Sequence, residues 1–114
     1  MKLAFFETPA FTHHLRGYLD DEGYRDLQNA LMEDPKRGDV IPGTGGFRKL
    51  RWEDRRRGKG KRSGLRLIYY HLEDSAQMWM FTLYDKDEAA DLTAEQKRVM
   101  KLAIEKEKQA RARR

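Results

Sequence analysis

Three β-rich segments follow one another in the middle of the chain, and this succession most constrains the fold. The segments are 47–52, 64–72 and 78–84. On the first of them, Leu50 and Trp52 share one face. Lys49 and Arg51 share the other, because successive side chains of a strand alternate. The last segment is nearly all apolar, as expected of a central strand that is covered on both faces. The sequence therefore predicts an antiparallel meander.

Two helical patterns precede these strands. Residues 2–7 predict a short strand, and Pro9 fits the first turn of a helix, where its missing N–H costs nothing. The apolar side of this helix is Phe11, Leu15 and Tyr18. Asp20 or Asp21 can cap a second helix, whose apolar stripe is Tyr24, Leu27 and Leu31. It ends before Pro35, which drives the preceding residue out of the α region. We expect the two helices to pack as a hairpin.

A third helix is expected after the last strand. Thr93 and Gln96 fit a capping box, in which each side chain accepts a hydrogen bond from the other residue's backbone N–H. The apolar residues assigned to the core are Val99, Met100, Leu102, Ala103 and Ile104. Beyond them the basic end, 105–114, is expected to be solvated or frayed. The sequence thus predicts an α+β fold, with helices on one face of the sheet and the opposite, basic face open to a ligand.

Positive charge is concentrated in two parts of the chain. From Arg48 to Arg66 there are ten Lys or Arg against two acids, and from Lys97 to Arg114 eight against two. These parts carry +8 and +6, so with a formal total of +5 the remainder sums to −9. The run within 53–63 could be only a solvated face, but it joins two strands that hold its charges above the sheet. Such a distribution is typical of a polyanion binder, and it favours nucleic acid over membrane.

Length and composition narrow the class further. At 114 residues, of which 39% are hydrophobic, the chain is expected to form one domain, 1–114, with a small core. The absence of cysteine excludes a disulfide framework and a thiolate metal site. No apolar run approaches the roughly 20 residues that span a bilayer, and the N-terminus lacks the apolar stretch of a signal peptide. We therefore expect a cytoplasmic protein that uses no cofactor or metal.

Two motifs that suggest ligand chemistry have simpler explanations. The segment 43–46, Gly-Thr-Gly-Gly, lacks the Gly-Lys-Ser/Thr ending of a phosphate loop and precedes a strand, so a tight turn is expected. His13 and His14 would point about 100° apart on a helix, without a carboxylate at ligand spacing. His71 alternates with apolar residues along its strand, so packing explains it at least as well as catalysis does.

Arg66 and Tyr84 are the residues best suited to RNA chemistry. Arg66 shares a strand face with Ile68 and Tyr70, so its guanidinium is either paired with an acid or reserved for a phosphate. The meander would bring Tyr84 and Lys86 beside it. Tyr, Lys and Arg without histidine can support RNA cleavage, because the substrate's 2′-hydroxyl is the nucleophile. The protein need only orient it, transfer protons and stabilise the phosphorane charge.

Five stretches of the chain, read together, form a specific pattern. They are DPKRGDVI at 34–41, GTGGFRKLR at 43–51, KGKRSGLRLIYY at 59–70, LYDKDE at 83–88 and DLT at 91–93. The pattern resembles the RelE/HigB toxins of type II toxin–antitoxin modules. It is most similar to the HigB-like branch, whose chains read G-T-G-G-x-R-K-I-R, G-K-G-K-R-G-G-x-R-I-I-Y-Y and Y-G-K-N-E.

The resemblance implies a small RelE-like, microbial RNase-type fold and a metal-independent endoribonuclease. Such a toxin cuts translated mRNA in the ribosomal A site and inhibits translation. It is neutralised by a cognate antitoxin with a helix-turn-helix DNA-binding domain, and when free it is expected to be a monomer. Carried over by motif, the catalytic residues would be Lys59, Lys61, Arg66, Tyr84 and Lys86. Phosphate backbones would be bound by Arg48, Lys49 and Arg51, and the basic turn adds Arg55, Arg56, Arg57 and Arg62.

One departure from the pattern keeps a second hypothesis open. Asp85 stands where the family pattern has glycine, and Asp87 where it has asparagine. Two carboxylates beside Lys86 would weaken anion binding there. The alternative to an mRNA-cleaving toxin is therefore a non-catalytic or attenuated RNA- or ribosome-binding protein of the same fold.

Overall fold

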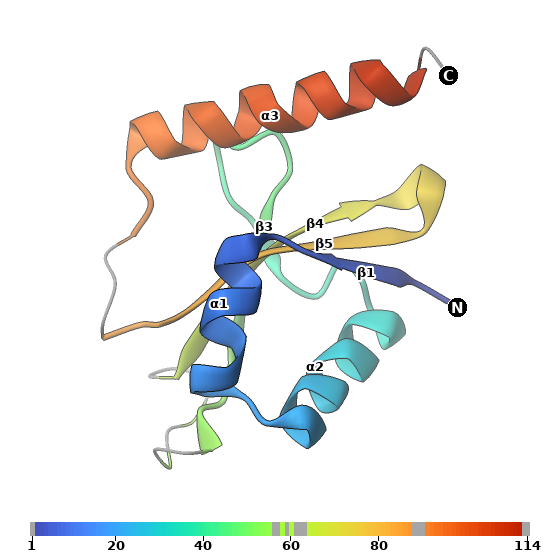
Figure 1. Ribbon diagram of the computed structural model, residues 1–114. Coiled ribbons are helices and arrows are strands. Elements are labelled where there is room, and N and C mark those ends of the chain that lie inside the picture. Colours follow the sequence, from blue (N-terminus) through green and yellow to red (C-terminus); the bar gives the residue numbers. More distant parts are fainter. Residues whose placement is uncertain (1, 56–57, 59, 61–63, 88–90, 113–114) are drawn as a thin grey trace.

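The computed structural model describes residues 2–55, 58, 60, 64–87 and 91–112. Its strands are β1 (Ala4–Glu7), β2 (Asp39–Val40), β3 (Arg48–Trp52), β4 (Leu65–Leu72) and β5 (Gln77–Asp85). The helices are α1 (Pro9–Tyr18), α2 (Asp21–Glu33) and α3 (Ala94–Ala112), with a short 3₁₀ turn η2 (Glu73–Ser75) between β4 and β5. Figure 1 shows α3 on one side of the sheet and α1 and α2 on the other. No helix among the described residues is long and apolar enough to cross a membrane.

The sheet is built around the predicted meander. Its strand order is β1-β5-β4-β3-β2, and only the β1–β5 pair is parallel. The prediction of three consecutive antiparallel strands is confirmed as β3–β4–β5, with β5 between β4 and β1. β2 was not predicted, because two residues within the Pro- and Gly-containing loop are too short for a periodic pattern to be visible.

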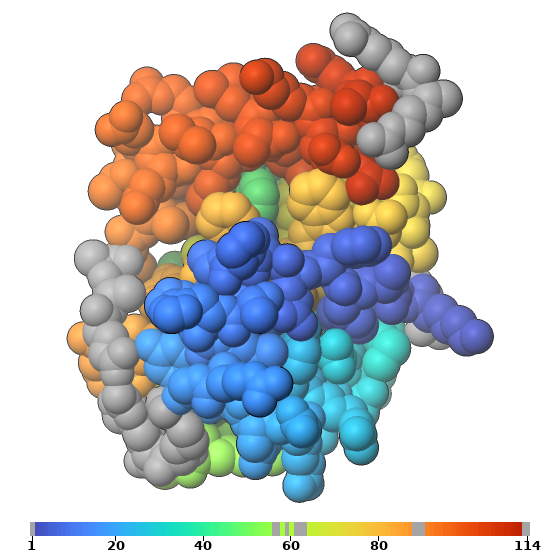
Figure 2. Space-filling model, in the orientation of Figure 1, coloured from blue at the N-terminus to red at the C-terminus, as the bar shows by residue number. Residues whose placement is uncertain are grey.

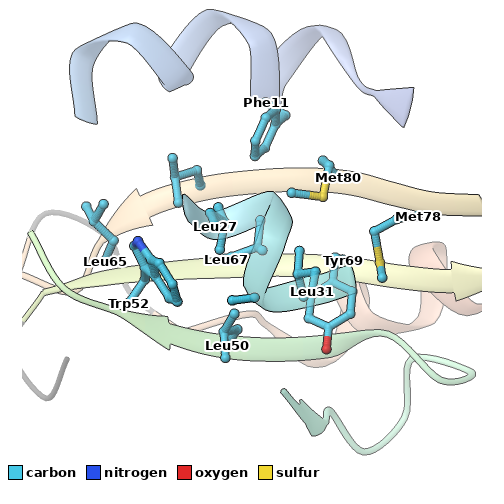
Figure 3. Close-up of a cluster of buried hydrophobic side chains, with 12 residues drawn as sticks. Phe11, Leu27, Leu31, Leu50, Trp52, Leu65, Leu67, Tyr69, Met78 and Met80 are labelled. Atoms are coloured by element: carbon cyan, nitrogen blue, oxygen red, sulfur yellow. The ribbon is translucent and has the colours of Figure 1, made fainter. Parts of the chain in front are cut away.

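Helices α1 and α2 cover one face, as their apolar stripes predict. Thr8 caps α1 by accepting from the backbone N–H of Phe11 at 3.1 Å, and Asp20 caps α2 by accepting from Gly23 at 2.7 Å. The Phe11 and Tyr24 rings join the two helices, with centroids 5.8 Å apart. Figure 3 shows the core that they close over the sheet; among its fully buried members are Phe11, Leu27, Leu31, Leu65, Leu67, Tyr69, Met78 and Met80.

Helix α3 covers part of the opposite face, so the expectation of one open, basic face is wrong. Met100 and Ile104 are buried against Ile68 and Tyr70 of β4 and against Phe47. Strand β4 is buried on both faces, because seven of its eight residues are buried. Both faces of β4 must therefore be shielded from water, and among the described elements α3 is the helix that packs on the second face. Figure 2 shows α3 and the N-terminal helices on opposite sides of the molecule.

The contacts of α3 differ from those assigned from the sequence. The capping box is confirmed: Thr93 N–H donates to Gln96 Oε1 at 2.9 Å, and Gln96 N–H to Thr93 Oγ1 at 3.1 Å. Val99 and Leu102, however, are 59% and 56% exposed, and Ala103 is exposed too. Met100 and Ile104, four residues apart, form a single narrow stripe, so only they reach the core.

The described part of the basic end, up to Ala112, is largely exposed as expected, but it is helical and contacts the sheet. The helix continues to Ala112, and Lys108 Nζ lies 5.0 Å from the centroid of the Tyr70 ring. The Arg111 guanidinium lies 5.3 Å from the Trp79 ring and donates to Gln77 Oε1 at 2.9 Å. Cation–π contacts with the buried Tyr70 and the half-buried Trp79 thus extend the attachment of α3 beyond its two buried residues.

The glycine-rich segment is a tight turn beneath α3, as predicted. Gly43, Gly45 and Gly46 have φ values of +82°, +78° and +115°, which favour glycine. The buried Thr44 hydroxyl closes the turn, donating to the Ile41 carbonyl at 2.7 Å and accepting from Phe47 N–H at 3.1 Å. A Cβ on Gly45 would lie 3.2 Å from Ile104, so the turn also lets α3 approach closely.

Candidate nucleic-acid interface

Three adjacent strands place Arg51, Arg66 and Tyr84 in one row. Arg51 of β3 lies directly opposite Arg66 of β4, and Arg66 lies directly opposite Tyr84 of β5. Directly opposed side chains project from the same face, with Cβ atoms about 4.5–5.5 Å apart. By the alternation along β4 this is the face of Ile68 and Tyr70, which α3 covers further along the strand. The row therefore lies near the N-terminal end of β4, on the same side of the sheet as α3.

Arg66 is held rigidly within this row. Arg66 is only 5% exposed, and its Nη1 donates a hydrogen bond to the Leu65 carbonyl at 3.1 Å. A guanidinium remains charged at any working pH and can make two parallel hydrogen bonds to a phosphate. Arg51, directly opposite and exposed, adds a second positive charge.

Tyr84 supplies a protonated phenol to the row. Burial raises the pKa of the Tyr84 hydroxyl, the negative charge of Asp91 raises it further, and the positive charge of Arg66 acts in the opposite direction. A phenol can act as a base near neutral pH only where nearby cations lower its pKa well below about 10. Because the net effect is upward, its hydroxyl is a hydrogen-bond donor at neutral pH and a poor proton acceptor.

Lys49 extends the row toward a cavity. It lies two residues before Arg51 on the same face of β3, and its Nζ is 3.7 Å from Asp91 Oδ1. The cavity measures about 190 Å³ and is lined by residues of five segments that meet above the sheet. Its lining residues are Asp39, Val40, Ile41, Pro42, Lys49, Ile68, Tyr84, Asp91, Leu92 and Lys97.

The structure does not bring Arg48 and Arg55 into this row. Arg48 projects to the other face, where its Nη1 donates to the carbonyls of Lys36 at 3.2 Å and Gly38 at 2.8 Å. Arg55 forms ion pairs with Asp26 of α2 at 3.1 Å and with Glu53 at 2.8 Å. Its hydrogen bond to Glu53, above all, raises the pKa of the Arg55 guanidinium. Both arginines hold parts of the fold together, which a count of charges cannot reveal.

The sequence suggests that the Asp85 carboxylate is a surface charge beside Lys86, but the structure places it in the interior. Asp85 is completely buried, and its Oδ1 accepts from the backbone N–H of Asp87 at 2.7 Å. It follows Tyr84 in the strand, so it projects to the opposite face. Lys86 is exposed and its backbone N–H donates to the Gly64 carbonyl at 3.1 Å. Asp85 therefore acts as a turn-forming residue, and its effect on anions at Lys86 is smaller than the sequence implies.

The remaining site candidates of the basic turn lie outside the described residues. These are Arg56, Arg57, Lys59, Lys61 and Arg62. Conversely, the structure brings Asp39, Asp91 and Lys97 to Tyr84, and the sequence had not singled them out as site residues. Asp39 and Asp91 belong to two of the five motif stretches, and this was the one sign in the sequence that they could belong to the site.

His71 stands apart from the row, near the β4–β5 turn. Its Nδ1 is buried and has no hydrogen-bond partner among the described residues. Burial lowers the pKa of the His71 imidazole, the nearby Glu73 carboxylate opposes this, and Lys36 and Arg48 reinforce it. These features agree with the interpretation of His71 as a packed residue.

Known protein structures support the assignment of the fold, but they do not identify the chemistry of the row. No protein-family model matches the chain. It is similar to the free-state structure of an E. coli toxin RelE mutant with two arginines replaced by alanine. The TM-score is 0.53 at 18% sequence identity, covering 79% of this chain and 88% of that one. It is also similar to the isolated E. coli RelE toxin, with a TM-score of 0.50 at 13% identity, covering 92% and 98%. The chain therefore has the α+β fold of the RelE toxin.

Proposed function

We propose that this protein is the toxin of a type II toxin–antitoxin system, of the HigB-like branch, and that it cleaves translated mRNA on the ribosome. The observation that carries the proposal is the row of Arg51, Arg66 and Tyr84 on adjacent strands of a RelE-like sheet. Two guanidiniums and a phenol on one face suit a phosphodiester and its adjoining ribose. The excess of positive charge between Arg48 and Arg66 supports an RNA-rich target.

The reaction needs no group beyond the substrate and side chains. The 2′-oxygen attacks the phosphorus, and the bond from phosphorus to the 5′-oxygen breaks. The products are a 2′,3′-cyclic phosphate and a 5′-hydroxyl, so one proton leaves the 2′-hydroxyl and one reaches the leaving oxygen. Arg66 stabilises the charge that develops on the phosphorane oxygens. Tyr84, protonated at neutral pH, donates a hydrogen bond, and by motif Lys59, Lys61 and Lys86 are the proton-transfer candidates.

The proposal includes partners and a place of action. The substrate is mRNA in the ribosomal A site, where the ribosome holds the 2′-hydroxyl in line with the phosphorus. Positioning of this kind can lower a barrier by several kcal/mol, about 7–11 kcal/mol in well-oriented systems. A cognate antitoxin with a helix-turn-helix domain would neutralise the toxin, which is a monomer when free and acts in the cytoplasm.

One observation favours a second candidate, an RNA- or ribosome-binding protein without catalytic activity. The raised pKa of Tyr84 removes the phenolate that could have served as the base in this row. In that case the row would bind a phosphate without cleaving the chain. The buried position of Asp85 weakens the argument that the sequence offered for this candidate, whereas Asp87 is exposed next to Lys86 and keeps part of it.

Cleavage of a defined mRNA by the purified protein separates the two candidates. We expect cleavage on programmed ribosomes and little on naked RNA at physiological salt. Arg66→Ala should slow it by about 100- to 1000-fold, as is typical when one transition-state stabiliser is removed. Arg25→Ala, an exposed arginine of α2 on the other side of the sheet, is the matched control and should cleave at the parent's rate.

Two outcomes would contradict the toxin proposal. One is that a folded parent protein binds ribosomes but leaves mRNA intact, which would support the binding protein. The other is that Arg66→Ala, shown to be folded by circular dichroism, cleaves as fast as the parent. Growth arrest on expression, relieved by co-expression of the neighbouring reading frame, should accompany cleavage.

A further inference from the structure

We infer that the cavity beside Tyr84 receives a single nucleobase of the bound RNA and selects bases whose edge donates hydrogen bonds. This inference rests on the proposed function, because the RNA strand must first be held at Arg51 and Arg66. The cavity measures about 190 Å³ and lies between β2, β3, β4, the end of β5 and the segment that leads into α3. None of the sequence motifs assigned a role to it.

The cavity continues from the phosphate row. Lys49 and Ile68 line it, and they lie directly opposite each other, two residues along from the Arg51–Arg66 pair. Two residues of a strand span roughly 7 Å, a separation that the phosphate and the base of one nucleotide can bridge. Tyr84 belongs both to the row and to the cavity wall. A strand whose phosphate lies between the two arginines therefore has a base within reach of the cavity.

The walls suit the faces of a base. Ile41 and Ile68 are buried apolar residues, and Pro42, Leu92 and the Tyr84 ring add further non-polar surface. Val40 at the rim is 51% exposed, an unusual exposure for a large apolar residue. An unstacked base is commonly held between aromatic and apolar side chains. One wall is fixed by the glycine-rich turn, because the Lys97 side chain lies against Gly43, with Cδ 3.9 Å from where a Cβ would stand.

The rim supplies the means of selection. Asp39 lies directly opposite Lys49, whose Nζ is 3.7 Å from Asp91, and the Asp91 side chain is 91% exposed. Carboxylates only accept hydrogen bonds, and each has more acceptor sites than one distant ammonium can use. The amino groups of cytosine, adenine and guanine can donate to them. Uracil presents its single N3–H between two carbonyl oxygens, which the carboxylates repel.

Mapping of cut sites on ribosome-bound mRNA tests the selection. We expect uracil to be depleted at one fixed position near the cut by about 5- to 100-fold, the range of a well-made base contact. Asp91→Asn keeps the shape but replaces an oxygen acceptor by a donor, so it should reduce that depletion to about twofold or less. Asp74→Asn, an exposed acid in the turn after β4, is the matched control and should leave the pattern unchanged. An unchanged pattern in Asp91→Asn would overturn the inference.

The two readouts also separate selection from a general change in rate. Loss of the Asp91 charge lowers the pKa of Tyr84, since that charge helps to raise it. Such a change would alter cleavage equally at every site. Only a base-reading role for Asp91 alters the ratio between sites that differ in one base.

A binding measurement tests the cavity even if the parent protein cleaves nothing. Hexamers of deoxycytidine and deoxyuridine cannot be cleaved, share one backbone and differ only at the base edge. The parent should bind the cytosine hexamer about 5- to 100-fold more tightly than the uracil hexamer, and Asp91→Asn should narrow the gap. Equal affinities, or no binding of either hexamer, would overturn the inference. Selective binding without cleavage would overturn only the proposed activity.

Discussion

At the scale of single residues, Tyr84 is where the structure changes the expected chemistry most. Its ring packs against the apolar cluster between the sheet and α3, and it also lines the cavity. Its raised pKa keeps the hydroxyl protonated. We expect Tyr84→Phe to slow cleavage on ribosomes by about 10- to 100-fold, the value of a hydrogen bond to a charged group. Tyr84→Ala should cost more, because it also removes the wall of the cavity.

The comparison of these two variants is informative in either direction. Equal losses in Tyr84→Phe and Tyr84→Ala would show that the hydroxyl alone matters and that the ring does not position the substrate. Single-turnover rates on programmed ribosomes measure the effect without a contribution from product release. Antitoxin binding by each variant would verify that the fold is retained.

His71 should make the stability of the protein depend on pH. Burial lowers its pKa in the folded state, so the unfolded chain binds the proton more readily. The contribution of His71 is therefore fully present above its unfolded pKa of about 6.5 and is lost as the pH falls below that value. The melting temperature should fall between pH 7.5 and 5.5, and by less in His71→Phe. His13→Phe, an exposed residue of α1, should behave as the parent does; identical pH dependence in all three proteins would refute the assignment.

At the scale of elements, α3 depends on very few buried side chains. Ile104 is 2% exposed and contacts the core of the second face, whereas Leu102, two residues earlier, is 56% exposed. Ile104→Ala should lower the free energy of unfolding by about 2–5 kcal/mol, because it removes transfer energy and leaves a cavity. Leu102→Ala, the matched control on the same helix, should change it by no more than about 0.5 kcal/mol.

Urea denaturation followed by circular dichroism measures both variants of α3. If Ile104→Ala proved as stable as Leu102→Ala, the placement of α3 on the sheet would be wrong. A loss of stability in Leu102→Ala alone would instead indicate that the exposed face of the helix is covered by another molecule.

At the scale of the whole molecule, the distribution of charge decides how binding responds to salt. The row face carries Lys49 and Arg51, while Arg48 and Arg55 are engaged with the fold. Replacing Lys49 and Arg51 together by alanine should reduce the slope of log affinity for single-stranded RNA against log salt by about 1.4, or about 0.7 for each phosphate contact.

A second double variant with the same net charge serves as the control. Arg16 and Arg25 are exposed arginines on the helices of the other side. Replacing both by alanine lowers the charge by the same two units and should leave the slope unchanged. Equal slopes for the two double variants would mean that net charge alone, and not the row, sets the affinity.

Much of the fold was predictable because strand alternation and helix capping depend on residues close together in the sequence. The alternation of Lys49, Leu50, Arg51 and Trp52 predicts β3 and its two faces, and the structure confirms both. Pro9, Asp20 and the capping box at Thr93 mark the helix starts within a residue. Such signals are local, since a cap or a strand period is decided by residues three or four positions apart.

The row of the candidate site was partly predictable for the same reason. Strand period and the meander order of β3, β4 and β5 place Arg51, Arg66 and Tyr84 on one face, so adjacency follows from topology. The role of Arg48 did not follow, because its carbonyl partners Lys36 and Gly38 lie ten or more residues away. The ion pair of Arg55 with Asp26 did not follow either, because it joins the basic turn to α2. The same holds for the cavity, whose lining comes from five separate segments.

The sequence by itself determined where the helices and all strands but β2 lie, which face of β3 is apolar and where positive charge gathers. Only the tertiary structure decided that α3 lies across the second face of the sheet and that Asp85 is buried. It also decided that Asp91 stands beside Lys49 and Tyr84. The physical reason is that propensity, capping and periodicity act between neighbours along the chain, whereas burial and pairing depend on which distant surfaces exclude water together.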